Sequence, residues 1–367
     1  MAESVLASTM IAPKTFEVRE YPMPDLPKNA GLLRVEATGV CGSDVHQQTR
    51  MRGTAHILGH EITGRIAALG SEHQARKAGF KEGDRVALEE YMPCGACDFC
   101  RTDDYRFCQQ TDPGGSAKFP MFYGTTPTDI APALWGGYSH YLYLHPNCVM
   151  HRVPDHLSPP LAALFLPMSN GVEWMYRYGD LQLGDSVVVQ GPGQQGLAAA
   201  VTAREAGAER IIVTGLSHDA HRLALAQKLV GADVIDVEKE SFREKVMDLT
   251  GGKGVNVVVN VTGGGKDTVA DAVAVASKAR CTIVLAAAGN QTLDVSALGR
   301  AKVVLKRANG HSYYAVEQAI RLIGSGKYAL NDLCTHTYGL KDVGLAIRTV
   351  AGDGVPGGIH VSVLPWT

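Results

Sequence analysis

The sequence lacks long apolar runs, an excess of charge of either sign and a recognisable leader, and each absence narrows the choice of function. No stretch reaches the ~18 consecutive apolar residues of a membrane-spanning helix. The formal net charge is −2, so no basic surface is expected for nucleic acid or an acidic membrane. Residues 1–10 contain Glu3 and no basic region before an apolar core, so we expect no signal peptide.

What the chain does contain fits a globular protein of about two domains. It has 367 residues, of which 45% are hydrophobic and 20% are charged, an ordinary balance for a protein with a large core. Without an export signal we expect a cytoplasmic location, which is a reducing compartment. The eight cysteines are therefore expected to act as metal ligands more than as disulfide partners.

Four of the eight cysteines stand close together in the first third of the chain. They are Cys94, Cys97, Cys100 and Cys108. Zinc takes four soft ligands in a tetrahedron, and a closed set of four thiolates leaves no position for a substrate. We therefore expect a structural zinc that stabilises a loop. A chance cluster or a disulfide pair is the alternative.

The chain changes character along its length. Residues 1 to about 160 carry many Gly and Pro residues and short apolar runs at 32–37 and 85–88, which favours irregular β structure. Strands then alternate with helices, which favours a parallel sheet with crossover helices. The predicted strands cover 186–190, 210–214, 255–261, 281–286 and 359–363, and the predicted helices cover 197–206, 219–230, 267–277, 314–323 and 341–350.

A second group of metal-binding residue types lies before the cysteine loop. Cys41 opens the segment Cys-Gly-Ser-Asp-Val-His, and His60 and Glu61 follow in Gly-His-Glu. Cys41 and His60 are natural ligands of a catalytic zinc, and Glu61 could bind zinc directly or act from behind a ligand. Ser43 and His46 could relay the proton that an alcohol loses, with Asp44 orienting one of them. Taken alone, each of these residues could instead have a structural role, either as a hydrogen-bonding side chain or as a small side chain in the core.

Together, these motifs resemble those of the zinc-dependent medium-chain dehydrogenases, in the branch of sorbitol and threonine dehydrogenases. The shared features, in order, are Cys-Gly-Ser-Asp-x-His, Gly-His-Glu, Gly-Asp-Arg-Val at 83–86, the four-cysteine loop and a Gly-x-Gly-x-x-Gly motif. The resemblance implies a mixed α/β protein with a GroES-like, mostly β catalytic domain and a doubly wound Rossmann domain. The implied domains are residues 1–160 completed by 305–367, and residues 161–304.

One position departs from this family pattern. Relatives carry a further zinc ligand just before the Rossmann domain, where this chain has Leu166 in Leu-Pro-Met-Ser. Three readings follow. Zinc is held by Cys41, His60 and Glu61 with water; another residue such as Glu173 supplies the ligand; or the chemistry does not need the zinc.

The glycine motif points to a dinucleotide. Gly191, Gly193 and Gly196 follow a predicted strand and open a predicted helix, the context that gives this motif meaning. The three glycines allow a tight turn, a close approach of the backbone to the pyrophosphate, and close packing of helix on strand. The helix N-terminus then faces the phosphates. An ordinary glycine turn is the alternative.

The ribose position favours NADP over NAD. An acidic residue about 20 residues after the motif would bind the ribose hydroxyls of NAD, but Gly215 stands there. A glycine removes repulsion against a 2′-phosphate, which Ser217, His218 and Arg222 could receive. The alternative is loose discrimination with NAD still used. Asp219 could replace the missing acid, or it could cap the next helix.

The substrate is the least determined part of the prediction. An aromatic loop between Cys108 and Gly137 contains Phe119, Phe122, Tyr123 and Trp135. Such a loop could line a pocket for a bulky, hydrophobic or cyclic alcohol, or it could pack on a neighbouring subunit.

Two alternatives to a zinc alcohol dehydrogenase remain at this stage. One is a zinc-independent reductase or lyase, and the other is a dinucleotide-binding protein without turnover. A homodimer or homotetramer is expected from the resemblance.

Overall fold

The computed structural model describes residues 4–50, 54–115, 117, 119–287, 289, 291–299 and 301–367. Contacts divide the chain into two units. The first unit comprises Met1–Leu166, Ile320–Ser325 and Leu333–Thr367, and the second comprises Pro167–Ala319 and Gly326–Asp332. Within the described ranges, no helix is long and apolar enough to cross a membrane.

The first unit is built mainly from two β-sheets. The larger has seven strands in the order β15-β16-β3-β5-β6-β8, and β7 pairs with β3. The smaller has the order β2-β1-β4. The bounds are β1 Ser4–Ala12, β2 Thr15–Pro22, β3 Gly31–Gly39, β4 His56–Ile57, β5 Glu61–Leu69, β6 Arg85–Leu88, β7 Tyr141–Leu144, β8 Met150–Arg152, β15 Cys334–Tyr338 and β16 His360–Val363. Most pairs are antiparallel, which suits short connections between neighbouring strands.

Short helices and two apolar clusters complete this unit. The helices are α1 Gly42–Gln47, α2 Gln74–Lys77, α3 Asp98–Arg101, α4 Pro159–Ala163 and α11 Val343–Ala351. One cluster joins Ile57 and Tyr138 to Val361 of the C-terminal strand. The other joins Ile62 of β5 to Trp135. The segments that carry Cys41, His60 and Tyr138 are therefore anchored in a packed interior.

The second unit is a doubly wound parallel sheet, as predicted. Its order is β11-β10-β9-β12-β13-β14, and every pair is parallel. The strands are β9 Ser186–Gln190, β10 Arg210–Gly215, β11 Asp233–Asp236, β12 Val257–Asn260, β13 Cys281–Leu285 and β14 Val303–Arg307. The near-continuous apolar runs of β9 and β12 are typical of strands covered on both faces. In sheets of this kind a ligand crevice is expected at the carboxyl edge, where the strand order reverses between β9 and β12.

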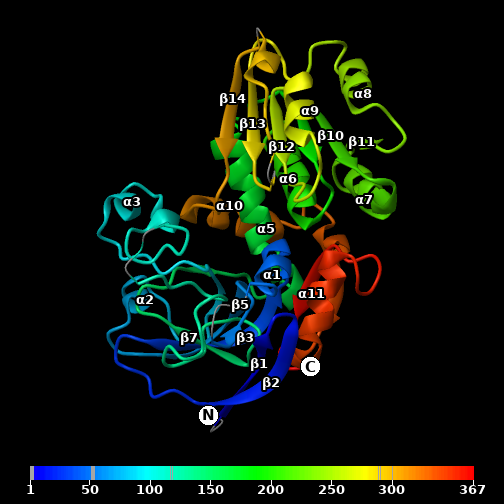
Figure 1. Cartoon of the computed structure of the whole chain (residues 1–367). Helices are drawn as coiled ribbons and strands as arrows, with labels where there is room; N and C mark the ends of the chain where they lie inside the picture. The colour runs from blue at the N-terminus through cyan, green and yellow to red at the C-terminus, as the bar shows by residue number, and fades with distance from the viewer. Residues whose placement is uncertain are drawn as a thin grey trace. The chain divides into compact units, whose positions relative to one another are not determined.

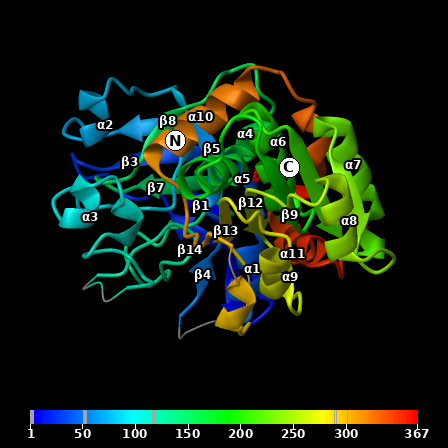
Figure 2. The ribbon, with the colours of Figure 1, turned by 90° about the horizontal axis from the view of Figure 1, so that it is seen from above.

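Several helices lie in this second unit or extend into it. They are α5 Phe165–Val172, which runs into a π-helical turn at Glu173–Tyr178, then α6 Gln194–Glu205, α7 Ala220–Val230, α8 Phe242–Leu249, α9 Thr268–Ala274 and α10 Tyr313–Gly324. Helix α6 packs on β9 and β10, and α7 packs on β10 and β11 (Figure 1). From above, α7 and α8 lie at the end of the sheet opposite β14 (Figure 2).

Candidate functional site

Cys41 and Asp44 are held together at the start of α1. Cys41 lies just before the helix in an extended conformation, and its N–H donates to Asp44 Oδ2 over 2.9 Å. A carboxylate at the third helical position commonly binds the amide that precedes the helix, which fixes how the chain enters it. Asp44 is fully buried, so this bond also satisfies part of a carboxylate that lies away from water.

His60 and Glu61 reach the same place from the start of β5. Gly59, at φ +90°, lets the chain turn immediately before them in a conformation that other residues disfavour. His60 is 7% exposed and Glu61 is fully buried. The ligand atoms of Cys41, His60 and Glu61 all lie within 4.8 Å of one another. The structure thus brings together the three residues that the sequence indicated as a ligand set.

Burial and neighbouring charges set the ionisation of this cluster. Burial raises the pKa of the Glu61 carboxyl well above its usual range, and the Cys41 sulfur adds to the rise. Burial acts to lower the pKa of His60, but the charges and hydrogen bonds of Asp44 and Cys41 together outweigh burial, and the pKa lies well above its usual value. Buried sulfur, nitrogen and oxygen atoms that face one point repel one another when no cation lies between them. A divalent cation at that point would offset the repulsion.

The donor set and its orientation fit zinc. Thiolate, imidazole and carboxylate are all zinc ligands, and three of them leave a fourth tetrahedral position for a substrate oxygen. His60 Nδ1 lies 3.6 Å from Asp44 Oδ1. A carboxylate beside one imidazole nitrogen is the usual way to orient a histidine so that its other nitrogen can bind metal. Cys41, His60 and Glu61 are therefore the residues that could hold a zinc here.

Ser43 and His46 occupy different environments on α1. Ser43 Oγ lies 3.3 Å from His60 Nε2, directly beside the ligand cluster. His46 lies in the last turn of the same helix and is exposed. Residues three apart share a helix face, so Ser43 and His46 lie on the same side of α1.

Leu166, which stands where the family has a zinc ligand, and Glu173, a possible substitute ligand, are not part of this cluster. Leu166 is 3% exposed and lies in α5. Glu173 lies in the second unit, where its Oε2 accepts a hydrogen bond from Ser312 Oγ over 2.6 Å. Among the residues that the structure describes, the groups able to hold a metal include neither Leu166 nor Glu173.

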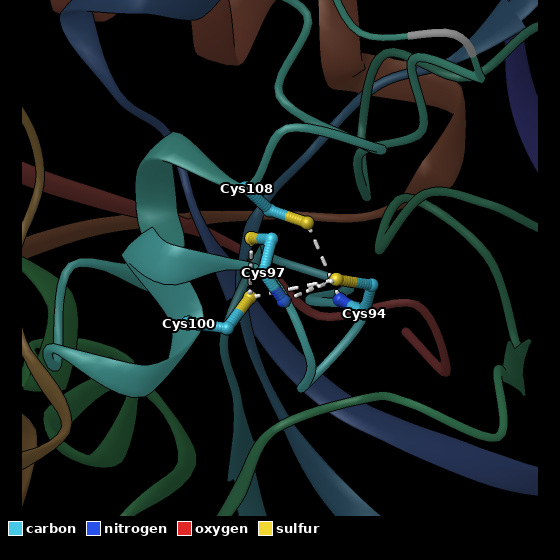
Figure 3. Close-up of side chains that lie close together, drawn as sticks. All are labelled: Cys94, Cys97, Cys100 and Cys108. Carbon is cyan, nitrogen blue, oxygen red and sulfur yellow. Dashed lines mark hydrogen bonds between the residues drawn. The ribbon is translucent and has the colours of Figure 1, made fainter.

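The four-cysteine loop forms a second, separate cluster in the first unit. The sulfurs of Cys94, Cys97, Cys100 and Cys108 all lie within 4.8 Å of one another and point towards a common centre (Figure 3). The sulfurs of Cys97 and Cys100 are 3.4 Å apart, and those of Cys94 and Cys100 are 3.9 Å apart. A zinc tetrahedron with bonds of ~2.3 Å has edges of ~3.8 Å, so the spacing suits zinc.

Backbone N–H groups of the same loop donate hydrogen bonds to these sulfurs. The Cys94 N–H donates to Cys108 Sγ over 3.3 Å, and the Cys97 N–H donates to Cys94 Sγ over 3.4 Å. Burial acts to raise the pKa of Cys108, but hydrogen bonds from Thr111 and from backbone N–H groups lower it to about 6. A thiolate is the form that binds a metal.

A buried polar network that the sequence did not reveal anchors this loop. Tyr105, just before Cys108, donates its hydroxyl to Glu89 at 2.8 Å from Oε1. His151 Nε2, from β8, lies 2.7 Å from the same oxygen. The side chains of Glu89 and His151 are fully buried, and Tyr105 is 9% exposed. The cysteine loop is thereby tied to the sheet behind it.

The glycine motif has the predicted geometry in the second unit. Gly191 follows β9 at φ +105°, and Gly193 immediately precedes α6. A Cβ on Gly196 would lie 1.9 Å from the Gly191 carbonyl oxygen, so only glycine fits where helix and turn pack. A Cβ on Gly193 would meet no atom within 4 Å, so this glycine faces open space at the helix N-terminus. The arrangement suits a bound pyrophosphate.

The ribose position is more acidic than the sequence suggested. Gly215 ends β10 and pairs in register with Asp236 of β11. Ser217 Oγ donates to Asp236 Oδ2 over 2.8 Å, and Arg222 donates to Asp219 Oδ1 over 2.9 Å. His218 is exposed. Asp219 accepts from the N–H of Leu216 and binds no amide of α7, so it stabilises the turn before that helix.

The aromatic loop after Cys108 lies partly in the core. Tyr123 and Trp135 are buried, and their polar atoms are bonded to the carbonyl oxygens of Tyr143 and Ile130. Phe119 is 63% exposed. The Phe122 ring packs edge-on against Tyr91 at 5.2 Å between centroids. Most of these aromatic residues therefore stabilise the first unit.

Two family models match most of the chain. Residues 27–155 match the alcohol dehydrogenase GroES-like domain, and residues 196–325 match the zinc-binding dehydrogenase domain. The first range contains both clusters that could hold a metal, and the second begins at the last glycine of the dinucleotide motif.

Individual proteins are similar over the same extent. A probable alcohol dehydrogenase of Mycobacterium tuberculosis is 39% identical, with 96% of each chain covered. The sorbitol dehydrogenase of Bacillus subtilis is 32% identical over 71% of this chain and 69% of its own. The solved structure of an alcohol dehydrogenase from Thermotoga maritima superposes with a TM-score of 0.86 at 23% identity, covering 99% of this chain and 100% of the other.

Proposed function

The chain belongs to the zinc-binding alcohol dehydrogenases, a family with a GroES-like domain and a Rossmann domain, and on this premise we propose its reaction. It is an NAD(P)-linked oxidoreductase that moves a hydride between an alcohol and the nicotinamide. We propose that the alcohol is primary or secondary and that Cys41, His60 and Glu61 hold a catalytic zinc. The convergence of their ligand atoms within 4.8 Å carries this proposal.

The chain's own residues handle the proton in this scheme. A zinc held by Cys41, His60 and Glu61 would polarise the substrate oxygen, and a bound nicotinamide would accept the hydride from carbon. Ser43 Oγ, beside His60, accepts the hydroxyl proton and passes its own along α1 to the exposed His46, which releases it to water. Asp44 holds the Cys41 N–H and faces His60, so it orients both proposed ligands.

A structural zinc at the four cysteines is the second part of the proposal. Its support is the spacing of the sulfurs and the depressed pKa of Cys108. Four thiolates close the coordination sphere, so this ion would hold the loop and take no part in turnover.

We propose NADP as the preferred carrier, with NAD as the alternative. The support for NADP is Gly215, which leaves no carboxylate at the end of β10. A Cβ at Gly215 would approach Pro192 Cγ to 2.8 Å, so the glycine is also required by packing. Asp236, bonded to Ser217, works against a 2′-phosphate and limits the preference. The ratio of the two affinities is then a balance between Arg222 and the neighbouring carboxylates.

For the substrate we propose a bulky, hydrophobic or cyclic alcohol. The support is the replacement of the family's usual ligand by the apolar Leu166 and the exposed aromatic side chain of Phe119.

The remaining sequence-based expectations also stay as proposals. They are a catalytic domain of residues 1–160 and 305–367, a Rossmann domain of residues 161–304, a cytoplasmic location and a homodimer or homotetramer. The exposed Val304 and Leu305 on the edge strand β14 support self-association, because an uncovered sheet edge presents groups ready to pair.

Metal analysis of matched variants tests the proposed function. Wild-type protein should contain about two zinc ions per chain, and Cys41→Ala should contain about one and lose activity with NADP or NAD. Cys148→Ala removes another cysteine of the first unit, and it should keep both ions and the activity.

Three results would reject the zinc mechanism or replace it. Full turnover in Cys41→Ala would exclude zinc catalysis. A single zinc in an active wild-type protein would indicate the zinc-independent reductase or lyase. Dinucleotide binding without turnover across a broad alcohol panel would indicate a non-catalytic protein.

A further inference from the structure

Tyr138 lies far from α1 in the sequence and meets Asp44 in the structure. Its hydroxyl donates to Asp44 Oδ2 over 3.1 Å, across 94 residues of chain. The ring is fully buried in the apolar cluster that also contains Ile57 and Val361. The family resemblance attached no role to this tyrosine.

The backbone of Tyr138 is fixed against the segment that carries His60. The Tyr138 N–H donates to the Leu58 carbonyl over 3.1 Å, and the Gly137 N–H donates to the Gly59 carbonyl over 2.9 Å. The Tyr138 ring also packs closely on Gly59, because a Cβ added to Gly59 would lie 2.7 Å from two carbons of that ring. Tyr138 therefore has little freedom relative to His60.

Asp44 links the fixed Tyr138 side chain to both proposed ligands, Cys41 and His60. Its Oδ2 accepts from the Cys41 N–H over 2.9 Å and from the Tyr138 hydroxyl. Its Oδ1 faces His60 Nδ1 at 3.6 Å. Rotation of the carboxylate would disturb the entry to α1 and the orientation of the imidazole together, and the tyrosine hydroxyl opposes that rotation.

We infer that Tyr138 is a positioning residue that acts through Asp44 to hold Cys41 and His60 in the geometry that retains the catalytic metal. The inference rests on the proposed metal site and adds a residue to it. Partners of metal ligands typically change metal affinity by ~10–100-fold when they are removed. Because Tyr138 acts one step further away, we expect an effect at the lower end, about tenfold.

Tyr123 offers a matched control within the same unit. It is also fully buried, and its hydroxyl makes two hydrogen bonds, one donated to the Tyr143 carbonyl and one accepted from the His145 N–H. Both of those partners are backbone groups. Tyr123→Phe therefore removes a buried hydroxyl with a similar loss of stability, and it leaves Asp44 untouched.

The experiment measures release of zinc from the full-length holoprotein by a chromogenic chelator. Tyr138→Phe should release one of its two zinc ions about tenfold faster than wild type, and the other at the wild-type rate. Tyr123→Phe should release both ions at wild-type rates even if its unfolding temperature falls. A cobalt-substituted protein gives a second readout, since the visible spectrum of the catalytic ion should change in Tyr138→Phe alone.

A double variant tests the route through Asp44. Asp44→Asn keeps the side-chain volume and weakens the contacts of the carboxylate. Adding Tyr138→Phe to it should speed zinc release little further, because both changes interrupt the same contact.

The outcomes separate this inference from the proposed function. Two zinc ions in wild type, with Tyr138→Phe behaving like Tyr123→Phe, would overturn the inference alone. Full additivity in the double variant would also overturn it. A wild-type protein that binds zinc only at its four cysteines would overturn both the proposed metal site and this inference.

Discussion

Ser217 gives its hydroxyl hydrogen to Asp236 across a distance of 2.8 Å, beside the glycine where an acid would mark a preference for NAD. The Ser217 N–H is held as well, by Glu238 Oε2 at 2.7 Å. A 2′-phosphate bound at Ser217 would therefore meet two carboxylates. A carboxylate of the neighbouring strand β11 therefore lies beside the position where β10 has none.

Asp236→Asn should raise the affinity for NADPH relative to NADH. Removing one negative charge close to the phosphate should change the ratio of dissociation constants by about fivefold, because water screens much of the repulsion in a well-solvated site. Titration of the intrinsic fluorescence with each reduced dinucleotide measures the ratio without turnover. Asp233→Asn, on the same strand and paired with Arg210, is the control and should leave the ratio unchanged. An unchanged ratio in both variants would remove Asp236 from cofactor discrimination.

Two glycines of the dinucleotide motif should fail in different ways when changed to alanine. Gly193→Ala should keep the unfolding temperature and weaken dinucleotide binding, because its Cβ would project into open space where the pyrophosphate is expected. Gly196→Ala should lower the stability of the second unit, because its Cβ would collide with the Gly191 carbonyl. Thermal unfolding and dinucleotide titration distinguish the two. Equal loss of stability in both variants would contradict the packing argument.

Tyr105→Phe should destabilise the first unit by ~1–3 kcal/mol, the usual loss when a buried acceptor is deprived of its donor. The buried Glu89 carboxylate would lose the hydroxyl that approaches both of its oxygens. Urea unfolding measures the change. Tyr328→Phe removes a hydroxyl that donates to the exposed Glu205, so it should change the free energy of unfolding much less. Similar losses in both variants would mean that burial is not the deciding factor.

Acid should destabilise the protein partly through His145. Burial, followed by the nearby His73, lowers the pKa of His145 from its ordinary 6.5 to about 4. Between these values the unfolded chain binds a proton that the folded chain does not. The contribution of His145 is therefore complete above pH 6.5 and declines as the pH falls towards 4. His145→Asn should unfold with a shallower pH dependence than wild type in this range, and an unchanged slope would contradict the assignment.

The regular elements could be predicted where the apolar pattern was strong. The spans 85–88 and 186–190 coincide with β6 and β9, and the helix expected over 219–230 is α7 to within a residue. Short or exposed elements were missed. Only one of the four residues of β11 is buried, and β14 has no buried residue, so neither carries a periodic signal.

The candidate ligands and Asp44 could also be found from the sequence, but Tyr138, which contacts Asp44, and Asp236, at the ribose position, could not. Cys41, His60 and the four cysteines stand in recognisable spacings. Tyr138 and Asp236 stand in no such motif, because their roles depend on which distant segments meet after folding. Their positions follow from sheet pairing and from contacts across many residues of chain.

The two metal-binding clusters also differ in how much of the chain must be in place before each can form. The four cysteines belong to one short segment, so closing that loop around zinc has a small entropic penalty and needs little other structure. The cluster of Cys41, His60 and Glu61 depends on Tyr138, which reaches Asp44 only after residues 94 positions apart have met. If both proposed sites bind zinc, the ion at the four cysteines can be captured as the loop emerges from the ribosome. The ion at Cys41, His60 and Glu61 must then wait until the surrounding sheets have assembled, so a shortage of zinc late in folding would leave a folded protein without its proposed catalytic ion.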